Sequence, residues 1–466
     1  MRMSRRAVGA GMLAAVAAPG ARAQPAWVAP DNGAIDRILA ERIDTLRQGV
    51  GIVVGVIDAK GRRVVSHGVA ARAPHSRPLD GGTVFEIGSM TKVFTSLLLA
   101  DAVRRGEVRL DDPVAKYAPA GARMPERGGR QITLIDLATH TSGLPRMPDN
   151  FKPANPENPY ADYDAAKLYA YLSGYALTRD IGAQYEYSNL GAGLLGDVLA
   201  REAGMTYEAL LRRRILEPLK MRDTTIALTA PLKARLAAGH TATLAPAANW
   251  DLDALAGAGA IRSTADDLLT FLAAELRYAP SPLAGAMADQ LVPRRKGPAP
   301  VDMALGWHVS SGEVYWHNGG TGGYRSFFGF DPKSRIGVVV LTNAATVAGG
   351  DDIGFHILAG RPLSKLQPAP PPRVAIALPS AAIAPFVGVY HLASAMKMEV
   401  SQEGARLFAQ LTGQARYEIF PEGPNDFFWK VVDAQVTFER DPAGGPVTRA
   451  VVHQMGRDTT WTRANP

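Results

Sequence analysis

Near the start of the chain, the spacing of hydrophobic residues changes from a helical to a strand-like period. From Ala34 to Gln48, apolar residues recur every three or four positions, which predicts an amphipathic helix. Two apolar segments follow at residues 51–57 and 63–69, separated by the turn Asp58–Gly61. Two such segments around a short turn that ends in glycine are typical of a β-hairpin. The chain is therefore expected to begin with a helix followed by sheet.

A second hairpin is expected much later, where residues 326–330 and 336–342 flank the turn Asp331–Ser334. Its return segment is almost entirely apolar, as in a strand that is buried on both faces. The segments with helical spacing between the two hairpins are 93–104, 190–202 and 207–215. Strands at both ends with helices between them predict an α+β domain. In this fold, the two ends of the domain close one antiparallel sheet around an inserted helical part, and the cleft between the two parts is the expected site.

Beyond residue 366 the pattern changes again. Residues 367–375 contain a run of prolines, which is typical of a stiff, extended linker. Short alternating segments follow, separated by Gly, Pro, Asn and Asp, and they predict a small β-barrel or sandwich. The expected strands are 398–401, 406–411, 417–420, 427–432, 435–440 and 448–454. We therefore predict a first domain at residues 24–366 and an all-β, barrel-like domain at residues 376–466.

Residues 1–23 have the features of a secretory signal. Arginines near the start precede an apolar stretch, and Ala21-Arg22-Ala23 before Gln24 fits the small-x-small pattern of a signal-peptidase site. Arg5 and Arg6 also resemble a twin-arginine signal, and the sequence leaves both export routes open. We predict an exported protein, periplasmic or secreted, with no membrane span once the signal is removed. Without its four arginines the net charge falls from +7 to +3, which gives no indication of a nucleic-acid partner.

The composition narrows the chemistry. Hydrophobic residues make up 47% of the 466 residues and charged residues 20%, which are values typical of globular proteins. Cysteine is absent, so disulfides, thiol nucleophiles and cysteine-ligated metals are excluded, and a covalent nucleophile must be an oxygen or a lysine. The nine histidines show no spacing typical of metal ligands. We therefore expect neither a metal nor a cofactor.

The first candidate motif is the segment 85–92, FEIGSMTK, which precedes a helical pattern. If the helix begins near Ser89, Lys92 lies on the same face and its amine can reach the serine hydroxyl. A serine alone is a weak nucleophile, and a lysine can accept its proton when burial and other cations lower the pKa of the amine. The pattern Ser-x-x-Lys alone is weak evidence, because it is also found at ordinary helix starts.

The second motif is Tyr187-Ser188-Asn189, just before another helical segment. A tyrosine acts as a base only beside cations such as Lys92, which stabilise the phenolate. Asn189 offers both a donor and an acceptor, so it can hold a substrate amide and orient the lysine. Taken alone, both residues have the simpler interpretation of packing and capping residues.

The third motif is the glycine-rich segment 317–323, HNGGTGG. Glycines beside a strand allow a ligand to approach backbone N–H groups closely. We expect the N–H of Gly320 to form an oxyanion hole with the N–H of Ser89, with Gly319 beside it. Taken alone, this segment is equally typical of a flexible loop.

Together the three motifs resemble those of the penicillin-recognising serine hydrolases, the family of class C β-lactamases, DD-peptidases and related esterases. FEIGSMTK is similar to that family's nucleophile signature, Tyr187-Ser188-Asn189 to its Tyr-x-Asn element, and His317-Asn318-Gly319 to its Lys-Thr-Gly or His-x-Gly element. Segments 110–113 and 140–145 are also similar. The resemblance covers roughly residues 30 to 360 in the family's order, and the tail resembles the lipocalin-like β-domain of some members.

The resemblance implies acyl transfer by an exported serine hydrolase on amide bonds of β-lactams or D-alanyl peptides. Ser89 would attack the carbonyl carbon, and Lys92 and Tyr187 would move its proton and later activate water. Asn189 would position the substrate, and His317 would bind its carboxylate or share in proton transfer. The expected partner is therefore a small molecule or a peptidoglycan peptide, and the sequence does not indicate an oligomeric state.

His317 is a departure from the lysine of many family members. A histidine with an ordinary pKa near 6.5 is mostly neutral at neutral pH, so we expect slow turnover of β-lactams. Two alternatives stay open: a carboxylesterase of the same fold, and a non-catalytic protein that binds penicillin or peptidoglycan.

Overall fold

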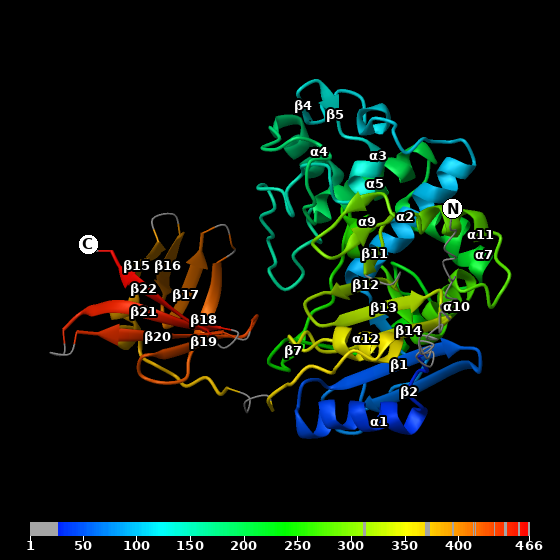
Figure 1. Ribbon diagram of the computed structural model, residues 1–466. Coiled ribbons are helices and arrows are strands. Elements are labelled where there is room, and N and C mark those ends of the chain that lie inside the picture. The colour runs from blue at the N-terminus through cyan, green and yellow to red at the C-terminus, as the bar shows by residue number, and fades with distance from the viewer. Residues whose placement is uncertain are drawn as a thin grey trace, which may run out of the picture.

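The computed structural model describes residues 27–310, 314–368 and 373–464, except positions 394, 395, 413, 415, 433, 442–444, 455 and 456. The expected signal at 1–23 and part of the expected linker lie outside these residues. Figure 1 shows an α+β region followed by a β-barrel, with a connecting segment between them.

An eight-stranded antiparallel sheet is the base of the α+β region, with the strand order β2-β1-β14-β13-β12-β11-β10-β9. Both predicted hairpins are present, and β1 also pairs with β14, so strands from the two ends of the region are neighbours. The strands are β1 (Gly51–Asp58), β2 (Gly61–Gly68), β9 (Arg295–Lys296), β10 (Asp302–Met303), β11 (His308–Ser310), β12 (Val314–Gly320), β13 (Arg325–Asp331) and β14 (Ile336–Thr342). The expected closure of the sheet by the two ends is confirmed.

Small two-stranded sheets lie outside this main sheet. Their strands are β3 (Val84–Glu86) with β8 (Arg262–Thr264), β4 (Glu126–Arg127) with β5 (Arg130–Gln131), and β6 (Gly239–His240) with β7 (Pro246–Ala247).

Helices cover both faces of the main sheet and fill the inserted part (Figure 1). The helices are α1 (Asn32–Ala40), α2 (Thr91–Arg104), α3 (Leu134–Ala138), α4 (Ala165–Gly174), α5 (Asn189–Glu202), α6 (Tyr207–Leu211), α7 (Glu217–Leu219), α8 (Ala230–Arg235), α9 (Ala256–Gly259), α10 (Ala265–Glu275), α11 (Ala284–Gln290) and α12 (Asp351–Ala359). The helix expected at 34–48 is present as α1, which continues as a π-helical segment, Glu41–Thr45, and buries Ile35 and Leu39.

The apolar sequence of β14 reflects its position between two cores. Val338 and Val340 pack into a cluster with residues of α1 and α12, whereas Val339 and Leu341 pack into the larger cluster that contains residues of α2 and α10. Side chains along a strand alternate between faces, so a strand covered on both sides needs an apolar residue at every position.

The inserted part is built around α2, whose residues Thr91–Ala102 are buried. Short α9 approaches α5 closely because glycines face each other: a Cβ on Gly196 would lie 2.8 Å from the Cα of Gly257. This approach matters for the site, because α9 also packs against α2.

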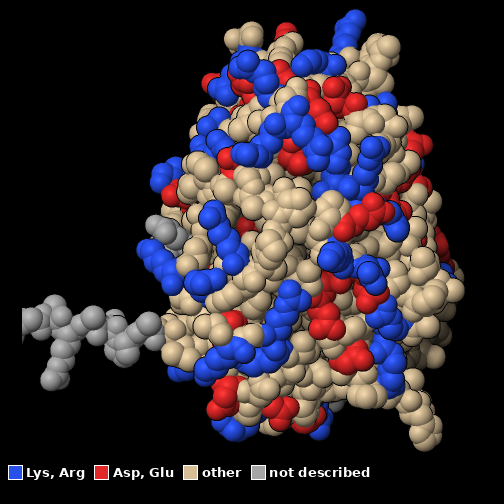
Figure 2. Space-filling model, turned by 90° about the vertical axis from the view of Figure 1, so that its right-hand side faces the viewer, with Lys and Arg blue, Asp and Glu red and all other residues tan. Residues whose placement is uncertain are grey.

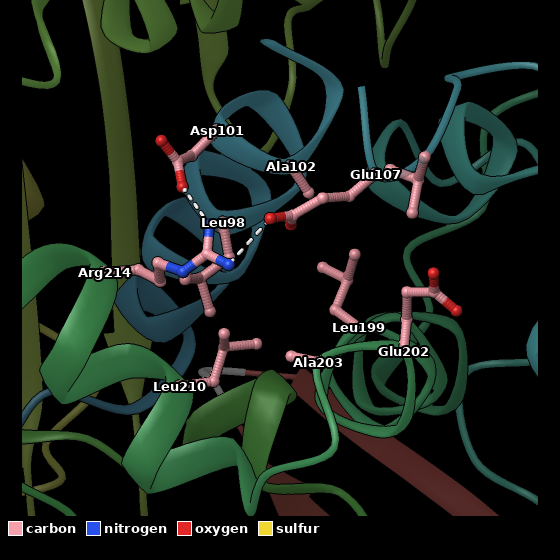
Figure 3. A pocket seen from close by; sticks show the side chains of 10 residues that line it. Leu98, Asp101, Ala102, Glu107, Leu199, Glu202, Ala203, Leu210 and Arg214 are labelled. Carbon is pink, nitrogen blue, oxygen red and sulfur yellow. Dashed lines mark hydrogen bonds and ion pairs between the residues drawn. The ribbon is translucent and has the colours of Figure 1, made fainter. Parts of the chain in front are cut away.

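A small pocket lies between α2, α5 and α6, where Arg214 bridges Asp101 at 3.1 Å and Glu107 at 2.8 Å (Figure 3). Its volume of about 10 Å³ is close to that of a single water molecule. The pocket is therefore a packing feature of the helices and too small for a substrate.

The second region is a closed barrel in which each strand pairs with its neighbour in the chain, and β15 pairs with β22. Short α13 (Ser380–Ile383) precedes the strands β15 (Gly388–Ala393), β16 (Met396–Glu403), β17 (Arg406–Leu411), β18 (Arg416–Pro421), β19 (Asp426–Trp429), β20 (Ala434–Arg440), β21 (Val447–Gln454) and β22 (Arg457–Arg463). The six expected strands are present, and the sandwich alternative is wrong because β15 and β22, which the sequence pattern did not indicate, close the barrel.

The surface shown in Figure 2 carries Lys and Arg side chains interspersed with Asp and Glu, without one dominant sign. Across the described ranges, no helix has the length and apolar character needed to cross a bilayer.

Candidate active site

Ser89 lies on a tight turn that leads into α2. Gly88–Met90 form a 3-10 turn and the α-helix begins only at Thr91, so the serine precedes the helix rather than starting it. Gly88 has a φ of +51°, a conformation that favours glycine. The turn leaves Ser89 partly exposed, whereas Gly88 and Met90 are buried.

Strand β12 packs directly against this turn. A Cβ on Gly319 would lie 2.0 Å from the carbonyl oxygen of Ile87, and a Cβ on Gly88 would lie 2.7 Å from the amide nitrogen of Gly320. Ser326 on β13 donates its hydroxyl to the same Ile87 oxygen at 2.8 Å. Glycine is therefore required on both sides of the contact, and the end of β12 lies beside the nucleophile turn.

The amine of Lys92 meets three oxygen atoms. Its Nζ lies 3.0 Å from Ser89 Oγ, 2.9 Å from Asn189 Oδ1 and 2.7 Å from the carbonyl oxygen of Ala258 on α9. The last two atoms can only accept hydrogen bonds, so they take two N–H groups of a neutral amine. The lone pair of the neutral amine is thereby directed toward the Ser89 hydroxyl.

Electrostatics favour this neutral amine. Lys92 is 2% exposed, and burial lowers its pKa well below 10.5, with a further decrease caused by the positive charge of Arg146. A lysine with a lowered pKa can accept a proton from a serine hydroxyl near neutral pH.

Ser188 explains how Tyr187 and Asn189 are positioned. Its hydroxyl caps α5 by accepting a hydrogen bond from Gly191 N–H at 2.8 Å, and it donates to the carbonyl oxygen of Pro145 at 2.7 Å. The capping function therefore belongs to Ser188, and the side chains on either side of it are directed at Lys92.

The Tyr187 ring lies 4.8 Å from Lys92 Nζ and 5.1 Å from the guanidinium carbon of Arg146. Burial raises the pKa of Tyr187, while a hydrogen bond with Ser89 and the charge of Arg146 oppose this increase. The phenol is therefore neutral at rest, so in the resting site the proton acceptor is Lys92 rather than a phenolate.

Three buried histidines surround Tyr187 and the end of β12. His140 lies 4.5 Å from the Tyr187 ring, and His308 lies 4.8 Å from His317. Burial lowers the pKa of each, to about 4 for His308 and well below the ordinary value for the other two. All three imidazoles are therefore neutral at neutral pH.

His317 has a fixed tautomer. Its Nδ1 lies 2.6 Å from the carbonyl oxygen of Asn318, so Nδ1 carries the proton and Nε2 is an acceptor. The buried Nε2 has no hydrogen-bond partner among the described residues. In this state Nε2 of His317 can accept a hydrogen bond, but it has no N–H to offer to a carboxylate.

A cavity of about 1040 Å³ extends beside the site. The segment 147–160 supplies one wall, including Met147, whose sulfur lies 3.7 Å from Asn189 Nδ2. Trp250 and Gly322 also line it, together with barrel residues such as Lys430. The long loop that follows Arg146 therefore borders a space large enough for a small molecule or peptide.

All of the residues singled out in the three sequence motifs lie around one turn and one strand end. The sequence patterns did not indicate the Ala258 carbonyl, His308 or Arg146. Of these, only Arg146 had a local signal, since it directly follows the segment 140–145, whereas the other two reach the site through tertiary packing. Within the described residues, no group of three potential metal-ligating side chains occurs.

Comparison with known proteins agrees with this fold. The family model described as "Beta-lactamase" matches residues 35–360, and one described as "Domain of unknown function (DUF3471)" matches residues 372–463. In the crystal structure of a beta-lactamase/D-alanine carboxypeptidase from Yersinia pestis, 93% of the chain superposes on 68% of this chain, with a TM-score of 0.58 and 29% identity.

Two curated relatives extend the comparison. The D-alanyl-D-alanine-carboxypeptidase/endopeptidase AmpH of Escherichia coli K12 is 30% identical over 338 residues, covering 67% of this chain and 86% of its own length. Penicillin-binding protein 4* of Bacillus subtilis 168 is 25% identical over 421 residues, covering 82% of this chain and 89% of its own length. The chain is a serine hydrolase of the beta-lactamase family.

Proposed function

We propose that the protein is exported and hydrolyses amide bonds of β-lactams or D-alanyl peptides through an acyl-enzyme on Ser89. The observation that carries this proposal is the short distance between Lys92 Nζ and Ser89 Oγ, with the other two contacts of the amine made to obligate acceptors. The substrate class follows the relatives, which are a D-alanyl-D-alanine carboxypeptidase and a penicillin-binding protein.

The reaction begins when the Ser89 oxygen attacks the substrate carbonyl and its proton moves to Lys92. The N–H groups of Ser89 and Gly320 stabilise the negative charge on the carbonyl oxygen. Tyr187, in contact with Ser89 and close to Lys92, carries the proton to the leaving nitrogen, and the bond to that nitrogen breaks. Water then attacks the acyl-enzyme and gives a proton to Lys92. The bond between the acyl carbon and Ser89 Oγ breaks, Lys92 returns the proton to Oγ, and the free acid leaves.

Asn189 holds Lys92 through Oδ1 and offers Nδ2 to the substrate amide. His317 shares in proton transfer through Nε2 rather than holding a carboxylate, because its only ring proton is directed at the Asn318 carbonyl. Gly319 keeps β12 against the nucleophile turn.

The remaining assignments concern the ends of the chain. We propose residues 1–23 as the export signal, residues 24–366 as the hydrolase domain, 367–375 as the linker and 376–466 as the barrel domain. Separate hydrophobic clusters in the two regions support this division. The closed barrel with next-neighbour strand order supports the description "lipocalin-like".

A carboxylesterase is the second candidate, and the neutral His317 favours it. Short-chain esters carry no carboxylate, so they need no cation in the site.

The test compares wild type with Ser89→Ala on a penicillin, a D-alanyl-D-alanine peptide and a short-chain ester. We expect peptide hydrolysis, slow penicillin turnover, and a mass increase equal to one penicillin on wild type alone. Turnover restricted to the ester would replace the proposal with the second candidate. Absence of both adduct and product with every substrate would indicate a binding protein.

A further inference from the structure

Arg146 lies beside Tyr187 and directly precedes Met147, a residue that lines the cavity. Its carbonyl oxygen accepts hydrogen bonds from the N–H groups of Asn189 at 3.0 Å and Leu190 at 3.3 Å, which ties the segment to the start of α5. The side chain is exposed, and its guanidinium lies over the Tyr187 ring. The backbone is therefore fixed, whereas the charged end is exposed beside Tyr187.

The guanidinium of Arg146 has no ion-pair partner among the described residues. Within the described part of the chain, no carboxylate lies within ion-pair distance of its guanidinium, although the nearby Arg179 pairs with Glu186. The positive charge acts instead on Lys92, His140 and Tyr187, where it favours loss of a proton.

The other basic groups around the site are poorly suited to hold an anion. Burial keeps His140, His308 and His317 neutral and lowers the pKa of Lys92. Arg325 donates through Nη1 to the carbonyl oxygens of Thr321 and Tyr324, both at 3.0 Å, and the carboxylate of Asp351 offsets its charge. Arg146 is thus a basic group beside Tyr187 without an ion-pair partner among the described residues, so its charge is available to a ligand.

We propose that Arg146 binds the carboxylate of the substrate, an inference that rests on the proposed function. D-Alanyl-D-alanine peptides end in a carboxylate, and penicillins and cephalosporins carry one beside the β-lactam ring. A guanidinium can hold such a group with two parallel N–H···O bonds. Arg146 is then the residue that makes the site prefer anionic amides over neutral esters, in a site where residue 317 has no charge.

The test measures kcat/KM for wild type, Arg146→Gln and Arg146→Lys on two substrates. One is a D-alanyl-D-alanine peptide and the other is an uncharged short-chain aryl ester. We expect Arg146→Gln to lower kcat/KM for the peptide by about 10- to 100-fold, the effect of one lost charge-assisted pair, mainly through KM. The ester value should change by less than about threefold, and Arg146→Lys should recover part of the peptide activity.

Arg325→Gln serves as the matched comparison, since Arg325 lies beside the glycine-rich segment but its guanidinium donates to backbone carbonyl oxygens. We expect its ratio of peptide to ester activity to equal that of wild type. The proposal would be overturned if the ratio of peptide to ester kcat/KM decreased in Arg325→Gln and kept its wild-type value in Arg146→Gln.

A purely electrostatic role of Arg146 gives a different result. If its charge only lowers the pKa of Lys92, Arg146→Gln loses activity equally on both substrates and its pH–rate profile moves to higher pH, which would also overturn the proposal. The proposed function is tested separately, by the wild-type protein alone. If that function is wrong, wild type shows no peptide hydrolysis that depends on Ser89. Thermal unfolding of each variant confirms that it is folded.

Discussion

The direction of the Lys92 lone pair is set by two neighbours that can only accept hydrogen bonds. Asn189 Oδ1 and the Ala258 carbonyl lie at 2.9 and 2.7 Å, and the remaining direction is toward Ser89. One neighbour comes from the start of α5 and the other from α9. A change in either hydrogen bond would leave the amine in the site, but its lone pair would be less well oriented toward Ser89.

Lys92→Met removes the proton acceptor while keeping an unbranched side chain. We expect it to lower the rate of acylation of Ser89 by about 10²- to 10⁴-fold. Asn189→Ala should lower it less, because the Ala258 contact remains. Mass spectrometry of the penicillin adduct against time measures both, with the exposed Lys233→Met as the control that keeps the wild-type rate.

The pH dependence of acylation follows from the lowered pKa of Lys92. The neutral amine is present above that pKa and is lost as pH falls through it, so the rate should reach its maximum well below pH 10.5 and decrease on the acidic side. A rate that increases only as pH approaches 10.5, the ordinary lysine value, would contradict a buried, neutral amine.

Glu275 is a buried carboxyl group that the site does not use. Among the described residues neither of its oxygens has a hydrogen-bond partner, and burial raises its pKa from 4.5 to about 8. The folded protein therefore holds this proton more tightly than the unfolded chain does. The free energy of unfolding is therefore not reduced by this carboxyl below about pH 4.5, and it decreases as pH rises toward 8.

The glutamine side chain in Glu275→Gln cannot ionise, so the variant should not show this decrease in the free energy of unfolding with pH. Between pH 5 and 7, we expect the wild-type free energy of unfolding to decrease by about 2 to 3 kcal/mol more than that of the variant. Urea unfolding at the two pH values measures the difference. The exposed Glu126→Gln should behave like wild type, and a Glu275→Gln protein with the same pH dependence as wild type would show that the carboxyl is not buried and uncharged.

At the scale of residues, the sequence predicted those parts of the site in which the reacting side chains are close together along the chain. Ser89 and Lys92 are three residues apart, so one turn of helix brings them together. Ala258 contributes a backbone carbonyl, which every residue type has, so no side-chain pattern could indicate it. His308 had no local signal, because its neighbours come from β12 and from the segment before α5.

At the scale of elements, the contact between β12 and the nucleophile turn is the tightest constraint on the site. Gly319→Ala would place a methyl group 2.0 Å from the Ile87 carbonyl oxygen and 2.5 Å from Ser326 Oγ, so strand and turn must separate. We expect a loss of about 1 to 3 kcal/mol of stability and a larger, more than tenfold decrease in kcat/KM, because the oxyanion donors move apart. Thermal unfolding and steady-state kinetics measure the two effects.

Gly174→Ala is the matched control, since a Cβ there meets open space. It should change neither quantity appreciably. Equal activity of the Gly319→Ala protein and wild type would mean that β12 does not position the reacting groups.

The predictability of the elements depended on how many of their residues face a core. The return strand β14 was evident because two cores make every position apolar. β15 and β22 were missed because they bury few residues: within Arg457–Arg463, only Trp461 is buried, and the rest are polar or charged. Their pairing in the closed barrel, rather than their sequence, makes them strands.

At the scale of the whole molecule, two sets of cores suggest two cooperative units. Barrel residues such as Phe386, Phe438 and Trp461 form one cluster, and the residues of the α+β region form the others. Trp461→Ala should therefore destabilise the barrel by about 3 to 5 kcal/mol and leave the hydrolase region unchanged.

Calorimetry of the full chain tests this separation. We expect two unfolding transitions. Acylation of Ser89 by penicillin should change the midpoint temperature of the hydrolase region, and Trp461→Ala should change that of the barrel. The half-exposed Val431→Ala is the control in the barrel. A single transition shifted by both changes would mean that the two regions unfold as one unit.

The pairing of β1 with β14 has a consequence for biosynthesis. A ribosome has to deliver the chain through Thr342 before β1 gains its second neighbour, and β12, which lies against the Ser89 turn, also emerges late. Contacts so distant along the chain form slowly, after the local ones. In a nascent or unfolded polypeptide, Ser89 therefore lacks its neighbours from β12. The protein becomes active as a hydrolase only after this region has been synthesised and has folded.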